Sequence, residues 1–186
     1  LYMAATEHRI FKNDETAERF YQTAADSVPE RAETWAAFAQ FSKLSNRPKA
    51  FQQAVLDAYR DHVGTGREPL PQIQAVVSIW QEGSQKLPEA TGTLARTLRK
   101  ALDAGLTPNE ARNQFGWPAE VLLVETQKPG VAPANRGIAL LNIGSMLNGM
   151  DQLPLAATVL KAAIHELPPK QAALAAERML LSIKND

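Results

Sequence analysis

Few residues of this sequence have the types and spacing that chemistry requires. The three histidines, His8, His62 and His165, lie far apart, without the Asp/Glu-x2-His or His-x3-His spacings of metal sites around them. The chain has no Cys, which excludes thiolate nucleophiles, disulfides and cysteine-based zinc or iron–sulfur sites. We therefore expect no metal site and no cysteine chemistry.

Two glycine-containing stretches and one acid pair are the remaining chemical candidates. VGTGREPL, residues 63–70, has no Lys-Ser or Lys-Thr to complete a phosphate-binding loop, and GSMLNG, residues 144–149, is not a nucleophile elbow. Asp57 and Asp61 lie four residues apart, so they share one helix face, which is typical of a solvated surface. The sequence predicts no catalytic residue, no cofactor and no enzymatic activity.

The charge balance narrows the classes of partner. The 186 residues include 20 Lys or Arg and 20 Asp or Glu, and no window concentrates one sign. This pattern predicts neither nucleic-acid binding nor attachment to an anionic membrane. Apolar runs such as AEVLLVE are much shorter than the roughly 20 residues that span a bilayer, so we expect no membrane insertion.

Apolar residues recur at helical spacing along nearly the whole chain. Two examples are the sets Ile73, Val77 and Trp80, and Leu94, Leu98 and Leu102. Breaks such as SNRPK, GLTPN and GWP separate these stretches, because Pro favours a first helical turn and Gly accepts a left-handed cap. The sequence predicts an all-α protein of about nine to eleven helices joined by short turns.

The stretch 137–170 has the residue order of a helical hairpin. Gly144 and Ala156 are small at the places where two helices would cross. Leu147 and Leu160 would fill the space around that crossing, and Pro168 would end the second helix. This order resembles the tetratricopeptide repeat (TPR), a helix–turn–helix unit of about 34 residues, with Leu in place of its preferred Trp and Tyr.

A second copy of the pattern lies near the N-terminus. Its residues have the spacing of the C-terminal unit: Ala17, Tyr21, Ala24 and Pro29. The following unit would begin at position 32 and place Trp35 at the family's most characteristic aromatic position. Since the pattern begins inside a repeat, we expect a segment of a longer array.

The resemblance divides the chain into three regions. TPR-like repeats, the first truncated at its start, are expected at 1–63, degenerate or irregular hairpins at 64–134, and a TPR repeat with a closing helix at 135–186. Within the middle region, 72–104 is expected to form one hairpin, in which Trp80 faces the second helix. Residues 107–126 are expected to form two short helices.

The resemblance implies a right-handed superhelical solenoid whose concave face is lined by the first helix of each hairpin and binds other proteins. The positions that face this groove in the family correspond here to Tyr2, Thr6, Arg9, Glu33, Ala36, Gln40, Lys43, Ile138, Leu141, Ser145 and Asn148. Members that clamp a terminal carboxylate use Lys and Asn at comparable places. Because those places hold Ala36, Gln40, Leu141 and Ser145 here, carboxylate clamping is disfavoured.

We therefore expect a non-catalytic scaffold that binds a peptide, helix or domain of another protein. Analogy with the family favours the assembly of a bacterial envelope, secretion or exopolysaccharide-export system, in the periplasm, over a cytoplasmic adaptor of a multi-subunit complex. A further alternative is DNA binding by a helix-turn-helix at residues 101–125. Its candidate second helix, PNEARNQFG, offers only Arg112 as a basic group, which is little to hold phosphates.

Overall fold

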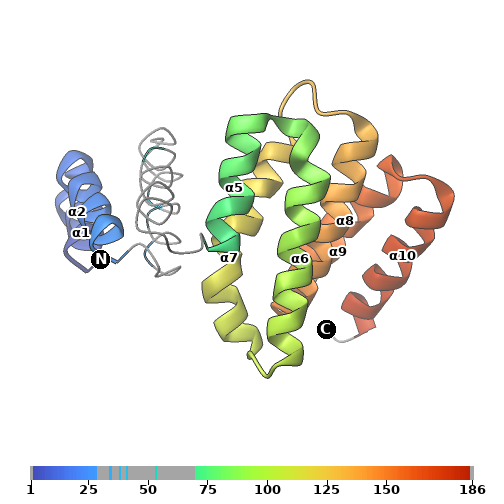
Figure 1. The fold of residues 1–186 in the computed structure, drawn as a ribbon. Helices are drawn as coiled ribbons and strands as arrows, with labels where there is room; N and C mark the ends of the chain where they lie inside the picture. The colour runs from blue at the N-terminus through green and yellow to red at the C-terminus, as the bar shows by residue number, and fades with distance from the viewer. Residues whose placement is uncertain are drawn as a thin grey trace. The chain divides into compact units, whose positions relative to one another are not determined.

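The computed structural model describes residues 2–28, the single positions 34, 38, 41 and 53, and residues 70–184. All regular secondary structure in this part of the chain is helical (Figure 1). The all-α class is therefore confirmed for the described residues. The chain divides into two compact units, Leu1–Ile73 and Gln74–Asp186.

The first unit begins with a helical hairpin. Helix α1, Tyr2–Thr6, continues into a π-helical turn, Glu7–Phe11, and α2 spans Asp14–Ser27. Lys12 ends the first helix in a left-handed conformation, with φ of 55°. The Asn13 side chain then caps α2 by accepting a hydrogen bond of 3.2 Å from the backbone N–H of Thr16.

The buried face of α2 follows a four-residue spacing. Ala17, Tyr21 and Ala25 are buried, and the Tyr21 ring stacks on Phe41 with centroids 4.9 Å apart. Ala24, which the repeat pattern places at the helix crossing, is half-buried. The buried set therefore agrees with the predicted one at Ala17 and Tyr21 and differs at the third position, where Ala25 is buried in place of Ala24.

The helices from residue 71 onward follow one another with short turns (Figure 1). They are α5 (Pro71–Glu82), a 3₁₀ turn (Ser84–Lys86), α6 (Leu87–Asp103), α7 (Pro108–Thr126), α8 (Pro133–Gly149), α9 (Leu153–Glu166) and α10 (Pro169–Lys184). Pro lies in the first turn of all six of these α-helices, where its missing N–H leaves no helical hydrogen bond unmade. At α7, Thr107 and Glu110 form a capping box, with the Thr107 N–H donating to the Glu110 carboxylate at 2.9 Å.

Helix α8 is the central helix of the second unit. It packs against α9, α6 and α7, and its buried residues cover most of its circumference, which leaves one half-buried face at Ile138, Asn142 and Ser145. A Cβ on Gly144 would lie 2.6 Å from Cγ of Leu160 in α9, and Ala156 is completely buried. The predicted role of Gly144 and Ala156 as small residues that allow close helix packing is confirmed.

Residues 107–126 are not two short helices: they form the single helix α7, with Gly116 and Pro118 in its interior. Trp117, Pro118 and Ala119 are all buried. Their burial offsets the roughly 3 kcal/mol that an interior proline costs. The break predicted at GWP is therefore wrong.

The stretch 72–104 does form two helices, α5 and α6, but α6 packs mainly against α8. The indole N–H of Trp80 in α5 donates to the Glu125 carboxylate of α7 at 3.2 Å, and the Lys128 ammonium lies 2.7 Å from the same carboxylate. α5 is thus tied to α7, a link that local periodicity does not reveal.

Within the described residues, none of the helices combines the length and apolar composition needed to cross a bilayer.

Candidate functional site

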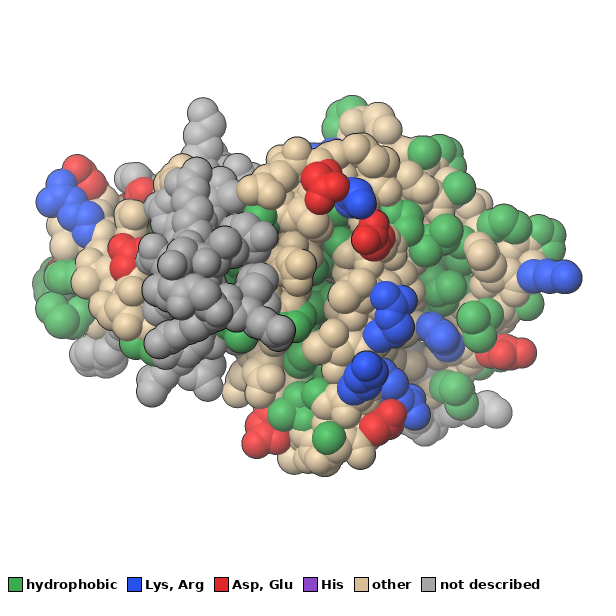
Figure 2. All heavy atoms as spheres, in the orientation of Figure 1, with side chains coloured by type: hydrophobic (Ala, Val, Ile, Leu, Met, Phe, Trp, Pro, Cys, Tyr) green, Lys and Arg blue, Asp and Glu red, His purple; other side chains and the backbone are tan. Residues whose placement is uncertain are grey.

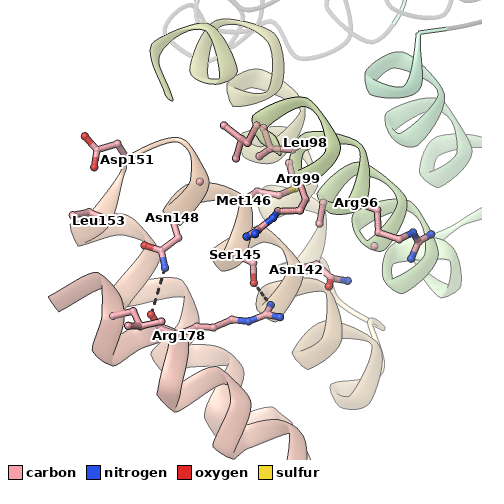
Figure 3. Close-up of a pocket in the computed structure, with 15 residues that line it drawn as sticks. Arg96, Leu98, Arg99, Asn142, Ser145, Met146, Asn148, Asp151, Leu153 and Arg178 are labelled. Atoms are coloured by element: carbon pink, nitrogen blue, oxygen red, sulfur yellow. Dashed lines mark hydrogen bonds between the residues drawn. The ribbon is translucent and has the colours of Figure 1, made fainter. Parts of the chain in front are cut away.

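A groove with a volume of about 770 Å³ lies on the second unit between three helices (Figure 3). We call it the α6–α8–α10 groove. Its lining residues come from α6 between Gly92 and Leu102, from α8 between Asn142 and Gly149, and from α10 at Arg178 and Leu181. Helix α7 contributes no residue to the lining, and α9 contributes only its first, Leu153.

The walls formed by α6 and α8 are held together by a close approach and a polar contact. A Cβ on Gly149 would lie 2.9 Å from Cδ1 of half-buried Leu102, so the Leu102 side chain reaches across to the backbone of α8. The Asn142 amide donates to the hydroxyl of Thr91 at 3.1 Å, and that hydroxyl donates to the Leu87 carbonyl at 2.6 Å. Because Thr91 is completely buried, this contact fixes one register of α6 against α8.

The third wall, α10, is joined to α8 by hydrogen bonds across the groove. The Arg178 guanidinium donates to the Ser145 hydroxyl, and the Asn148 amide donates to the Arg178 carbonyl at 3.4 Å (Figure 3). Arg178 therefore has a fixed position on the far wall. A guanidinium held in this way loses little further freedom when it binds a ligand.

The groove lining carries more positive than negative charge. Its arginines are Arg96 and Arg99 on α6 and Arg178 on α10, and its one carboxylate is Asp151, at the end of the groove away from them (Figure 3). Lys and Arg side chains also gather over α6 and the adjoining hollow in the space-filling view (Figure 2). The groove thus has a local excess of positive charge on a chain whose formal net charge is zero.

Apolar side chains lie between and beside these charges. Leu98 and Met146 are buried at the base of the groove, and Leu102 and Leu153 are half-buried. Leu181 on α10 is 58% exposed although it borders the same space. The groove therefore combines arginines with an accessible apolar surface, a mixture typical of protein-binding sites.

The structure brings together some of the predicted concave-face residues but not all. Ser145 and Asn148 line the groove, Leu141 is buried, and Ile138 is half-buried outside the lining. In the first unit Thr6 is half-buried. The side chains of Tyr2 and Arg9, and all of Glu33, Ala36, Gln40 and Lys43, lie outside the described residues.

Sequence reasoning missed four polar residues of the groove: Arg96, Arg99, Asn142 and Arg178. The arginines come from helices that are distant in sequence, so only the fold brings them together. A signal for Asn142 existed, because it lies three residues before Ser145 and six before Asn148. These three residues form a polar stripe on the mostly apolar stretch of α8 that follows Arg136.

Elsewhere in the second unit, Arg112 of α7 makes hydrogen bonds within the protein. Its guanidinium donates to the carbonyls of Met150 and Asp151 at 3.0 and 3.4 Å. These two hydrogen bonds tie α7 to the turn between α8 and α9. They also engage the one basic side chain of the helix considered for DNA binding. In the described part of the chain, no three His, Asp or Glu side chains gather where they could hold a metal ion.

Comparisons of the chain with protein-family models, with curated proteins and with solved structures found no match.

Proposed function

We propose that this chain is a non-catalytic scaffold of TPR-like helical hairpins that binds a segment of another protein in the α6–α8–α10 groove. The observation that carries the proposal is the origin of the lining residues. They come from alternate helices of the chain, with α7 absent and α9 represented by one terminal residue.

Alternation of this kind is expected when hairpins stack side by side. The first helix of each hairpin then lines one surface, and the second helix packs behind it. Here α6, α8 and α10 would be first helices, and α7 and α9 second helices. The packing of α8 on α9 and of α9 on α10 supports this order, as does the contact of α6 with α8. Continued along the chain, such stacking gives a right-handed superhelix.

The composition of the groove also favours a protein ligand. Peptide segments bind through polar contacts that fix their position and through side chains that fill apolar depressions. The α6–α8–α10 groove offers both, with the Asn142, Ser145 and Asn148 stripe on its floor and exposed Leu181 on its wall. Hydrogen bonds to Thr91, Leu141 and Arg178 hold the three side chains of the stripe in place, so they would present a fixed polar surface to a ligand.

Blocking the groove tests the proposal. Ala95 lines it and is half-buried, so Ala95→Trp places an indole in the binding space. Ala162 on α9 is exposed and outside the lining, so Ala162→Trp is the matched control. We expect phage-displayed random peptides selected on the parent protein to bind the Ala162→Trp variant equally well and to lose binding to the Ala95→Trp variant.

Circular dichroism establishes that both variants are folded before binding is compared. If selected peptides bind the parent and both Trp variants equally, or if selection yields no peptides, the groove is not the binding surface.

A further inference from the structure

We infer that the segment held in the α6–α8–α10 groove is acidic, with Asp or Glu side chains opposite the arginines and an apolar side chain against Leu181. The inference rests on the proposed function, because it names the chemistry of the partner in the same groove. It goes further in assigning the specificity to Arg96, Arg99 and Arg178.

The two arginines of α6, Arg96 and Arg99, make contacts that a ligand carboxylate would improve on or replace. The Arg96 guanidinium donates to the neutral Thr93 hydroxyl at 3.1 Å. Arg99 pairs with Asp103 at 3.0 Å, but the two side chains are 77% and 61% exposed, and exposed pairs are weak. A ligand carboxylate would form a charge-assisted hydrogen bond with Arg96 and could displace Asp103 from Arg99.

The arginines lie on two walls of the groove, α6 and α10, so a ligand needs more than one carboxylate to contact all of them. Arg96 and Arg99 lie three residues apart on α6, so they project from the same face of that helix. Arg178 is on α10, held against Ser145 of α8. Carboxylates spaced along a segment match this distribution, so recognition does not depend on a free C-terminus.

An apolar anchor is expected between the charges. Leu181 is 58% exposed, and Leu102 and Leu153 are half-buried around the same space. An apolar side chain surrounded by satisfied polar contacts is the usual centre of a protein interface. The partner segment therefore carries a Leu-like residue among its acidic residues.

The lining favours a peptide over a single-stranded nucleic acid, the other class of anionic polymer. Proteins hold single strands by combining basic side chains with aromatic rings on which bases stack. None of the residues that line the groove is aromatic, whereas Leu98, Leu102, Leu153 and Leu181 are aliphatic. Aliphatic side chains suit an apolar amino acid and offer no stacking platform for a base.

The test is to determine the sequences of the groove-dependent peptides and to measure their affinity by fluorescence anisotropy. Groove-dependent peptides are those that the Ala95→Trp variant no longer binds. We expect enrichment in Asp and Glu relative to the library, and unchanged binding when the peptide C-terminus is amidated. The double variant Arg96→Gln/Arg99→Gln should bind about tenfold more weakly, since two exposed charge contacts are lost. The control, Lys161→Gln/Lys170→Gln, removes two exposed charges outside the lining and should bind as the parent does.

Three results would overturn the inference while leaving the proposed function intact: groove-dependent peptides without acidic enrichment, peptides insensitive to the arginine substitutions, or peptides that need a free terminal carboxylate. A mixed-sequence oligonucleotide that binds the groove more tightly than the peptides would overturn both and assign the groove to nucleic acid. A selection in which no peptide depends on the groove would also overturn both.

Discussion

The close approach of α8 and α9 makes the effect of Gly144→Ala opposite to that of an ordinary glycine-to-alanine change in a helix. Alanine in a helix interior is favoured over glycine by about 1 kcal/mol. At Gly144, however, the new Cβ would lie 2.6 and 2.7 Å from Cγ and Cδ2 of Leu160, about 1 Å inside ordinary carbon contact. Because Leu160 is completely buried, it cannot swing into solvent.

Overpacking of a buried contact costs about 1–3 kcal/mol. Subtracting the helix gain of about 1 kcal/mol leaves Gly144→Ala destabilised by about 1 kcal/mol. Gly116 in α7 is the matched control, since the nearest atom to its Cβ would be Cγ of Arg112 at 3.8 Å. Gly116→Ala should therefore stabilise the protein by about 0.5–1 kcal/mol.

Urea denaturation followed by circular dichroism measures both variants against the parent. A double-mutant cycle with Leu160→Ala isolates the contact, because the cost of Gly144→Ala should disappear once the leucine is shortened. If Gly144→Ala stabilises the protein as much as Gly116→Ala does, α8 and α9 do not pack at this distance and the reasoning fails.

Three further predictions follow from packing and capping. Ala156→Leu adds volume at the same crossing, where Ala156 is completely buried, and should lower the free energy of unfolding by about 1–3 kcal/mol; an unchanged thermal midpoint would contradict this. Thr107→Ala removes the α7 capping box and should cost about 1 kcal/mol in urea denaturation, whereas Thr107→Ser should cost much less. The hydrogen bond from the Thr107 backbone N–H, followed by that from its hydroxyl, holds the pKa of Glu110 below its ordinary value of 4.5. The ionised carboxylate therefore stabilises the fold at neutral pH, and this contribution is lost as the pH falls below 4.5 and through the lowered pKa. Urea midpoints measured at neutral and acidic pH should accordingly fall less for Glu110→Gln than for the parent.

Local sequence features were sufficient to predict the helical class and the place where α8 packs closely against α9. The start of α7 follows from Thr107 and Pro108, and the α8–α9 crossing follows from the small residues Gly144 and Ala156. These features act over one or two helical turns or one hairpin. A pattern in the sequence can therefore report them directly.

The continuity of α7 and the composition of the groove depend on distant contacts. Pro118 has the residue type of a helix end, but burial of Trp117 and its neighbours keeps the helix intact. Arg96 and Arg178 reach one groove only because α6 and α10 both lie beside α8. A balance of 20 basic and 20 acidic residues, evenly spread along the chain, conceals this local excess of positive charge.

Arg112 contacts the α8–α9 turn and so influences the shape of the groove, although it is not one of the lining residues that give the groove its chemistry. Asp151, in a left-handed conformation with φ of 56°, and Leu153 form the end of the groove, while Arg112 holds the carbonyls of Met150 and Asp151 from α7. A substitution of Arg112 would release this turn without altering any residue that a ligand touches. If the groove binds a protein segment as proposed, selection acting on α7 would adjust its affinity during evolution while the residues that contact the segment stay the same.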